Sequence, residues 1–307
     1  MKDLVLFGDC RKTLPAFIDE ARMCVTSPPY YGLRDYGGEA SQIGMEQSPE
    51  EYIQQLVEVF RLVRDNLTDD GTLWVNIGDS YYNYRSDGNY PKQTVSKTRQ
   101  DLPTKTPVRG NKLEGLKSKD LIGIPWMLAF ALRADGWYLR QDIIWHKPNP
   151  MPESVKDRCT KAHEYIFLLS KNKNYYYNNE AIKEPAKDWG TRDRSNGKYH
   201  NPGSGLVPHS GLTKSYERKN KRSVWSVTKK PYKGAHFATF PPDLIEPCIL
   251  AGSEPGDIIL DPFMGSGTTA AVAKKNSRSY LGCELHEEYA SLQTARISSI
   301  PNKLPLY

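Results

Sequence analysis

The sequence predicts an α/β fold in which a mostly parallel sheet is covered by helices on both faces. Two observations predict it. First, the chain contains short runs that are almost entirely apolar, as expected of strands buried on both faces. Second, these runs alternate with segments whose apolar residues recur at helical spacing. The length of 307 residues fits one large domain with insertions, and we expect a single domain over residues 1–307.

Seven apolar or aromatic runs have the pattern of buried strands, and five other segments have the pattern of helices. The expected strands are residues 4–7, 23–26, 73–76, 143–145, 165–169, 258–260 and 280–283. The expected helices are residues 48–67, 124–134, 242–251, 268–275 and 287–297. Ligands of such sheets bind beyond the carboxyl ends of the strands, so we look for candidate site residues there.

The first of these helices has the clearest signal. Ser48 is suited to cap the first turn, Pro49 to the first helical position, and Glu51 to complete a capping box. The apolar side chains form one stripe, and we expect Gly71 to stop the helix after it. The stripe consists of Tyr52, Ile53, Leu56, Val57, Phe60, Val63 and Leu67.

Composition excludes several classes of protein. Hydrophobic residues make up 38% of the chain and charged residues 25%, which is enough apolar material for a core and too much for a disordered chain. The longest mostly apolar run, residues 122–132, is far shorter than the roughly 20 residues that cross a bilayer, and we expect no signal peptide. The five cysteines are scattered and lack zinc-knuckle spacing, so we expect no metal site and a reducing, cytoplasmic compartment.

Positive charge is concentrated in two segments. The net charge of the chain is +6, but residues 85–119 carry +6 and residues 170–235 carry +10, so the remainder is negative. Both segments are rich in Gly, Pro, Ser, Asn and Tyr and lack long apolar periodicity, which is typical of irregular insertions. Basic charge with interleaved aromatic residues indicates contact with nucleic acid. Solvated loops without a partner are the alternative interpretation.

A glycine turn follows the sixth predicted strand. Asp261 comes directly after the strand, Gly265 and Gly267 let the backbone approach a ligand closely, and a helix is expected from Thr268. The next strand ends at Glu284, 23 residues after Asp261. This is close to the spacing of roughly 20 residues at which a carboxylate holds ribose hydroxyls in a Rossmann-like unit. The alternative is a plain structural turn.

The residues of this turn exclude two phosphate-binding motifs. A P-loop needs Gly-Lys-Ser/Thr after the turn, and the dinucleotide motif needs a third glycine where Ala270 stands. An acid leading into the turn also repels a pyrophosphate. It suits a cationic ligand, such as the amine and sulfonium of S-adenosylmethionine.

The second strand end with unusual chemistry is Thr26-Ser-Pro-Pro-Tyr30. Pro28 and Pro29 stiffen the backbone and fix its carbonyl oxygens, and alone they would be explained more simply as a rigid turn. Ser27 adds a hydroxyl acceptor and Tyr30 a flat aromatic face. The lone pair of an amino group on a heteroaromatic base is delocalised into the ring. Acceptance of its hydrogens by Ser27 Oγ and the Pro28 carbonyl would favour a pyramidal, nucleophilic nitrogen, while Tyr30 stacks on a base flipped out of the duplex.

Together these motifs resemble those of the DNA amino-methyltransferases, S-adenosylmethionine-dependent enzymes that methylate exocyclic nitrogens of cytosine or adenine. Residues 26–30 resemble the catalytic motif and residues 261–269 the cofactor motif. Because the catalytic motif comes first, the chain is similar to the β group, a circularly permuted version of the Rossmann-like class I methyltransferase fold. The resemblance implies that the basic segment at residues 171–230 is a target-recognition insertion, while composition alone predicts the basic loop insertion at residues 85–119.

The resemblance also implies roles for individual residues. Ser27, Pro28, Pro29 and Tyr30 would be catalytic. The segment after the first strand resembles the acidic contact to the cofactor's adenine amino group, and residues 236–242 resemble the segment that lines its methionine side. The implied cofactor-binding residues are Asp9, Cys10, Phe240, Pro241, Asp261, Pro262, Phe263, Gly265, Ser266, Gly267, Thr268, Thr269 and Glu284.

The residue before the two prolines carries information on the target base. Within the family, Ser-Pro-Pro-Tyr is the form most associated with cytosine N4, whereas adenine N6 enzymes usually carry Asp or Asn there. Serine and aspartate both accept from an amino group, so we favour cytosine N4 and leave adenine N6 open. Methylation of cytosine C5 needs a cysteine nucleophile, and we expect Cys248, the residue after a proline, to be buried in a helix.

Duplex DNA and S-adenosylmethionine are the substrate and methyl donor that the resemblance implies, with no metal. A homodimer and a cognate restriction endonuclease are further partners that stay open. So do two other functions, a non-catalytic DNA-binding protein on a methyltransferase fold and methylation of RNA or of a protein glutamine. The intact Ser27 and Asp261 argue against the first, and the basic insertions argue against a protein substrate.

Overall fold

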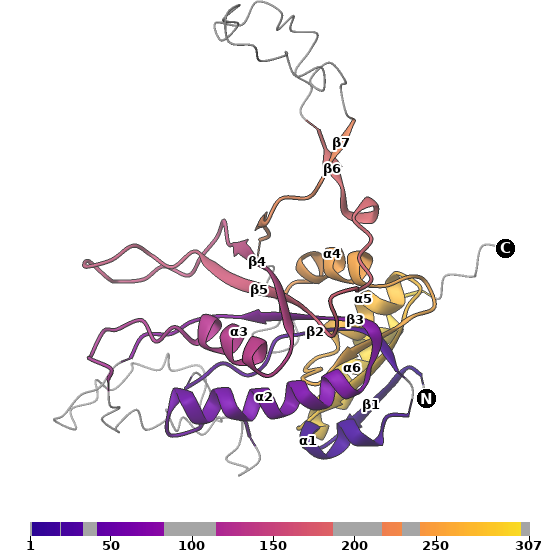
Figure 1. The fold of residues 1–307 in the computed structure, drawn as a ribbon, viewed down its shortest axis with the longest axis horizontal. Coiled ribbons are helices and arrows are strands. Elements are labelled where there is room, and N and C mark those ends of the chain that lie inside the picture. Colours follow the sequence, from indigo (N-terminus) through magenta and orange to yellow (C-terminus); the bar gives the residue numbers. More distant parts are fainter. Residues whose placement is uncertain are drawn as a thin grey trace, which may run out of the picture.

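The computed structural model describes residues 2–18, 20–32, 42–82, 115–186, 217–228 and 240–301. Its centre is one eight-stranded sheet with the order β1-β10-β9-β2-β3-β5-β4-β8 (Figure 1). All seven predicted strands are present in it. The bounds are β1 Leu4–Phe7, β2 Ala21–Thr26, β3 Leu67–Ile77, β4 Tyr138–His146, β5 His163–Ser170, β8 Val224–Ser226, β9 Ile258–Asp261 and β10 Ser279–Glu284.

The sheet is parallel from β1 to β3, and β5 runs antiparallel to both of its neighbours, β3 and β4. Strands β2 and β9 pair directly, with Cys24 opposite Leu260, although more than 200 residues separate them in the chain. The strand that leads to the two prolines therefore lies beside the strand that leads to the glycine turn. This arrangement is the Rossmann-like, mostly parallel sheet that the sequence predicts.

The five predicted helices are also present. Their bounds are α2 Pro49–Asp65, α3 Ile124–Ala134, α4 Pro242–Gly252, α5 Thr268–Lys275 and α6 Ala290–Ser298, the last preceded by a 3-10 turn at Glu287–Tyr289. The short helix α1 (Cys10–Thr13), which continues into a 3-10 turn at Leu14–Ala16, was not expected. Cys248 is buried within α4, as predicted.

The two faces of the sheet are covered by different helices, with α2 and α3 on one side and α4 and α5 on the other (Figure 1). Consecutive strand residues point to opposite faces. Cys24 and Leu73 pack in the cluster with α2 and α3, whereas Met23 and Trp74 pack in the cluster with α4 and α5. Burial on both faces explains why the strands could be recognised as almost continuous apolar runs.

The expected end of helix α2 is wrong. Ser48 caps the first turn as predicted, accepting from Glu51 N, but the helix ends at Asp65, and Leu67 already begins β3. Gly71 lies inside that strand. Leu67 pairs with Ala21, but the next paired position is Thr72, so β3 bulges there. A Cβ at Gly71 would lie 2.8 Å from the Thr68 carbonyl oxygen, so the bulge requires glycine.

Only parts of the two predicted insertions lie within the described residues. Residues 115–119 and the flanks 171–186 and 217–228 are described. In the flanks, β6 (Glu184–Pro185) and β7 (Arg218–Lys219) form a two-stranded stem that projects from the sheet beyond α4 (Figure 1), while β8 joins the main sheet. The boundaries at residues 85–119 and 171–230 stay predictions. Among the helices of the described part of the chain, none has the length and apolarity needed to span a membrane.

Candidate active site

The two predicted strand ends meet in the structure through a buried hydrogen bond. Thr26, the last residue of β2, donates from Oγ1 to Asp261 Oδ1 at 2.6 Å. Asp261 ends the neighbouring strand β9, and both side chains are buried. The catalytic turn begins at the next residue, Ser27. The candidate catalytic and cofactor motifs are therefore in direct contact.

The carboxylate of Asp261 also organises the glycine turn. Its Oδ2 accepts from Thr269 Oγ1 at 2.5 Å, and Oδ1 accepts from Phe263 N at 3.0 Å. Burial raises the pKa of Asp261 to about 6, although the hydrogen bonds from Thr26, Thr269 and Phe263 act to lower it. Both oxygens are thus bound within the protein, and Asp261 joins β2, the turn and helix α5. A direct contact between Asp261 and a cationic cofactor stays a prediction.

Gly265 and Gly267, which the sequence predicts to allow a close approach of backbone to a ligand, both have a left-handed conformation. Their φ angles are +53° and +80°, and Gly267 is the N-cap of α5. A Cβ at Gly267 would lie 3.3 Å from the backbone of Gln293, whose side chain donates to the Gly265 carbonyl at 2.7 Å. A Cβ at Gly265 would meet nothing closer than 3.9 Å, so the turn is open there.

Glu284 ends β10 beside this turn. Its Oε2 accepts from Gly265 N at 2.7 Å and its Oε1 from His286 N at 3.0 Å. Burial raises the pKa of Glu284 above its ordinary value, although these hydrogen bonds oppose the shift. Each carboxylate oxygen has a second lone pair, so hydrogen bonds from ribose hydroxyls are compatible with this arrangement.

Asp9 and Cys10 follow β1, whose last pair with β10 is Phe7 opposite Glu284. The predicted acidic contact therefore lies at the same edge of the sheet as Glu284. Asp9 caps helix α1 and binds the guanidinium of Arg11, with Oδ2 and Nη2 2.7 Å apart. Burial acts to raise the pKa of Asp9, but the hydrogen bonds and charge of Arg11 outweigh it and hold that pKa below its ordinary value. Cys10 is buried in the core.

Ser266 in the glycine turn has a buried hydroxyl without a hydrogen-bond partner among the described residues. A buried polar group normally has a partner, so this hydroxyl indicates a ligand in the turn. The open backbone at Gly265 and the carboxylates nearby fit the ribose and amino-acid parts of S-adenosylmethionine. Phe240 and Pro241 are buried at the start of α4, and residues 231–239 lie outside the described residues.

The remaining predicted cofactor residues surround the same turn. Pro262 is buried and Phe263 half-buried. Thr268 begins α5, and its hydroxyl accepts from Arg296 of α6. The structure thus gathers the predicted cofactor residues of β1, β9, β10 and the glycine turn at the carboxyl edge of the sheet.

The catalytic turn is held from helix α2. Tyr52 is buried and donates from its hydroxyl to the Pro29 carbonyl at 2.7 Å. Tyr52 therefore binds the Pro29 carbonyl and not the Pro28 carbonyl, which is the acceptor that the sequence predicts for the amino group of the base. Ser27 is half-buried and Pro28 is buried. Gly44 packs closely against the backbone of the same turn, since a Cβ at Gly44 would lie 3.2 Å from the Tyr30 carbonyl oxygen.

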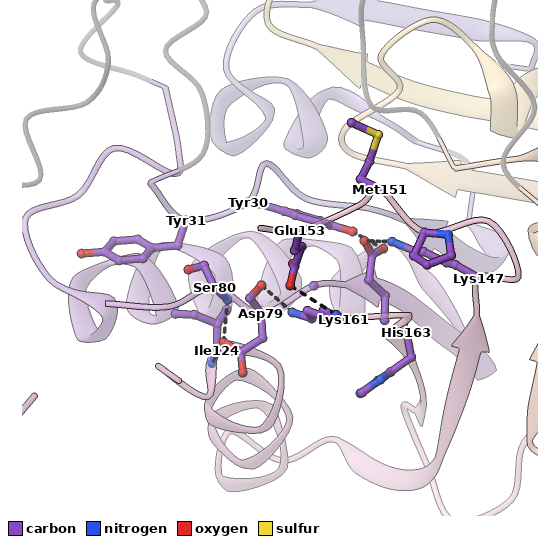
Figure 2. A pocket seen from close by; sticks show the side chains of 13 residues that line it. Tyr30, Tyr31, Asp79, Ser80, Ile124, Lys147, Met151, Glu153, Lys161 and His163 are labelled. Atoms are coloured by element: carbon purple, nitrogen blue, oxygen red, sulfur yellow. Dashed lines mark hydrogen bonds and ion pairs between the residues drawn. The ribbon is translucent and has the colours of Figure 1, made fainter. Parts of the chain in front are cut away.

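A pocket of about 340 Å³ lies against the Tyr30 side chain (Figure 2). Its charged side chains were not predicted as site residues. Tyr30 Oη donates to Glu164 Oε2 at 2.7 Å, and Glu164 also pairs with Lys147. The lining residues are Tyr30, Tyr31, Gly78, Asp79, Ser80, Ile124, Lys147, Pro150, Met151, Glu153, Lys161, His163 and Glu164.

Strand direction explains why Glu164 was missed. Ser27 and the glycine turn follow the carboxyl ends of β2 and β9, whereas β5 is antiparallel to β3, so the first residues of β5 lie at that edge of the sheet. Asp79, which follows β3, caps α3 with its carboxylate, which accepts from Gly123 N at 3.0 Å. Among the described residues, no group of three His, Cys, Asp or Glu side chains is placed to hold a metal ion.

Comparisons with known proteins agree with this geometry. A family model described as DNA methylase, of the N6/N4 type, matches residues 21–295. The chain is 48% identical over 298 residues to the Type II methyltransferase M.SmaI of Serratia marcescens, covering 95% of this chain and 90% of that protein. It is 48% identical over 280 residues to M.Cfr9I of Citrobacter freundii, covering 90% and 81%.

Solved structures share the fold. The PvuII DNA methyltransferase, described as cytosine-N4-specific, superposes with a TM-score of 0.64 at 18% identity, covering 99% of this chain and 88% of that one. A DNA modification methylase of Thermus thermophilus, solved with S-adenosylmethionine, gives a TM-score of 0.58 at 24% identity, covering 97% and 94%. The match of the family model over most of the chain shows that this protein belongs to the N6/N4 DNA methylase family, the S-adenosylmethionine-dependent DNA amino-methyltransferases.

Proposed function

We propose that the protein is a site-specific methyltransferase that transfers a methyl group from S-adenosylmethionine to the N4 amino group of cytosine in duplex DNA. The observation that carries this proposal is the 2.6 Å hydrogen bond between Thr26 and Asp261. It fixes the Ser27 turn beside the glycine turn, so a base at one turn is adjacent to a cofactor at the other. Proximity and orientation of this kind contribute strongly to methyl transfer between two bound reactants.

The residues of the catalytic turn act on the amino group of the flipped base. Ser27 Oγ and the Pro28 carbonyl accept its two hydrogens, which localises the nitrogen lone pair toward the methyl group. Tyr30 stacks on the base and holds its plane. When bound, S-adenosylmethionine supplies an electrophilic methyl group on a sulfonium.

The glycine turn and its neighbours hold the cofactor in this proposal. Glu284 binds the ribose hydroxyls, Ser266 donates its unpartnered hydroxyl, and Asp9 lies toward the adenine end. The other cofactor residues that we propose are Cys10, Phe240, Pro241, Asp261, Pro262, Phe263, Gly265, Gly267, Thr268 and Thr269.

The choice of cytosine N4 has two supports. Serine stands before the two prolines, and the structure described as cytosine-N4-specific shares the fold over nearly the whole chain. Methylation of adenine N6 would use the same geometry. The basic segments at residues 85–119 and 171–230 would bind DNA phosphates. The Type II relatives support a role beside a restriction endonuclease that reads the same DNA sequence.

The test is to incubate the protein with unmodified DNA of varied sequence and methyl-labelled S-adenosylmethionine, then to digest the DNA and identify labelled nucleosides by mass spectrometry. Labelled N4-methylcytosine is expected, and a Ser27→Ala variant should transfer much less label. Labelled N6-methyladenine would overturn the choice of base and keep the geometry. Label in RNA or protein, or no transfer to any substrate, would overturn the proposal.

A further inference from the structure

The Tyr30 ring is fixed at its hydroxyl by a side chain from another strand. Glu164, the second residue of β5, accepts from Tyr30 Oη at 2.7 Å. A longer contact of 3.5 Å joins Tyr30 Oη to Asn76 Oδ1. A ring that stacks on a base must keep a fixed plane. A hydrogen bond to its hydroxyl restrains that plane, so the partner of the Tyr30 hydroxyl affects the proposed stacking role.

Gly78, which directly follows β3, fixes the edge of the same ring. A Cβ at Gly78 would lie 2.8 Å from Tyr30 Cε2 and 3.3 Å from Glu164 Cδ. A contact below 3.0 Å cannot form without displacement, so the Tyr30 ring packs directly against the Gly78 backbone, and Glu164 packs closely beside it. The ring is thus held at its edge by packing and at its hydroxyl by Glu164.

Lys147 pairs with the carboxylate of Glu164. The two side chains form an ion pair and are only 9% and 12% exposed. Lys147 Nζ also lies 4.4 Å from the centre of the Trp145 ring, a cation–π contact. Burial, and then the charge of Glu164, raise the pKa of Tyr30 well above its ordinary value, so its hydroxyl keeps its proton and stays a donor. A hydrogen bond to a charged acceptor is about twice as strong as one between neutral groups.

A purely stabilising role does not account for this ion pair. Desolvation of two charges offsets most of their attraction, and apolar replacements of similar volume are often as stable. Lys147 and Glu164 also line the pocket beside Tyr30 and do not lie inside an apolar cluster. Their place next to the proposed stacking surface indicates a role in its geometry.

We propose that Glu164, held by its ion pair with Lys147, is a positioning residue that fixes the plane of the Tyr30 ring against which the flipped base stacks. The proposal rests on the proposed function, because it assigns Tyr30 the stacking role. Glu164 acts through Tyr30, and its effect therefore disappears when the Tyr30 hydroxyl is removed.

The test is a double-mutant cycle between Glu164→Ala and Tyr30→Phe. The methylated site of the wild type is first mapped by modification-sensitive sequencing, and single-turnover rates are then measured on a duplex containing that site, with saturating DNA and cofactor. Glu164→Ala should lower the rate about tenfold or more, as expected for loss of a charged hydrogen bond. In the Tyr30→Phe background it should lower the rate less than about twofold. Cofactor affinity by calorimetry should stay unchanged.

Two further variants complete the experiment. Glu164→Gln keeps the volume and an acceptor, so its rate should lie between those of the wild type and Glu164→Ala, and it provides the measurement if Glu164→Ala unfolds. Glu246→Ala is the matched control, because Glu246 forms an ion pair with Lys275 on α5, on the other helical layer, and its loss should leave the rate within about twofold.

Equal losses from Glu164→Ala in both backgrounds would overturn the proposal, since Glu164 would then act independently of the Tyr30 hydroxyl. A wild-type rate for Glu164→Ala would also overturn it. Failure of the wild type to methylate DNA is a different result, because it overturns the proposed function and with it the role of Tyr30.

Discussion

Thr26 and Asp261 are 235 positions apart in the chain, yet a buried hydrogen bond of 2.6 Å joins them at the carboxyl ends of two neighbouring strands. Asp261 extends the connection to Thr269 of α5 and to the backbone of Phe263. One carboxylate thus links the catalytic turn, the glycine turn and the helix that follows. Permutation of the motif order does not disturb this link, because sheet pairing and not chain order places the two strand ends together.

Replacement of Thr26 by valine tests this link, because valine keeps the shape and removes the donor. Asp261 would keep its bonds to Thr269 and Phe263 but lose one that favours its charged form. We expect a loss of about 1–3 kcal/mol in the free energy of unfolding and a lower methylation rate. Urea unfolding and a single-turnover assay measure the two effects. Thr26→Ser keeps the hydroxyl and should behave like the wild type; equal stability of Thr26→Val would show that the bond contributes nothing.

The raised pKa of Asp261 predicts a pH dependence with a definite sign. A carboxyl whose pKa is about 6 in the folded protein and 3.8 ordinarily binds its proton more tightly when folded. Its contribution to stability is therefore complete below pH 3.8 and is lost as the pH rises through about 6, a change of about 3 kcal/mol.

Asp261→Asn removes this titration with little change of volume. The stability of the wild type minus that of the variant should fall by about 3 kcal/mol between about pH 4 and pH 7. Urea unfolding of both proteins at several pH values measures the difference and cancels the other titrating groups. A difference that does not change with pH would contradict the assignment of the raised pKa to Asp261.

The sequence predicted the strands and the two motif-bearing turns because both leave local signals. Strands buried on two faces are apolar runs, and residues such as Ser27 and Asp261 stand out directly after them. The rule that ligands bind at the carboxyl ends of parallel strands pointed to both turns, whereas their adjacency comes from the pairing of β2 with β9. What each carboxylate binds was not predictable, and Asp261 proved to accept three internal hydrogen bonds, from Thr26, Thr269 and Phe263.

Two errors have physical causes that a single sequence does not reveal. Glu164 was missed because an apolar run does not show its strand direction, and antiparallel β5 brings its first residues to the site. The end of α2 was misplaced because Leu67 continues the apolar stripe of the helix while its backbone already pairs with Ala21. In both cases pairing between distant segments decides the outcome, and pairing is not a local property.

Ser266 should affect stability and cofactor affinity in opposite directions. Its hydroxyl is buried without a partner among the described residues, so Ser266→Ala removes an unsatisfied polar group. We expect the free protein to be as stable as the wild type or more stable by up to about 1 kcal/mol, while the affinity for S-adenosylmethionine falls. Thermal unfolding and calorimetry measure the two. Ser299→Ala, at the end of α6, is a control that should change neither, and unchanged affinity in Ser266→Ala would remove Ser266 from the cofactor site.

DNA binding should depend steeply on salt and on the stem formed by β6 and β7. Arg218 and Arg222 are exposed there, and Arg222 Nε lies 3.8 Å from Glu184 Oε2, a distant ion pair. Each arginine that neutralises a phosphate releases counterions, so the double variant Arg218→Gln/Arg222→Gln should reduce the slope of log affinity against log salt by about 2. Fluorescence anisotropy with a labelled duplex at several salt concentrations measures that slope. Arg61→Gln, which removes one exposed charge from α2 on the opposite helical layer, should leave it unchanged. An unaltered slope in the double variant would place the phosphate contacts elsewhere, because the loss of two counterion-releasing contacts cannot be silent in this measurement.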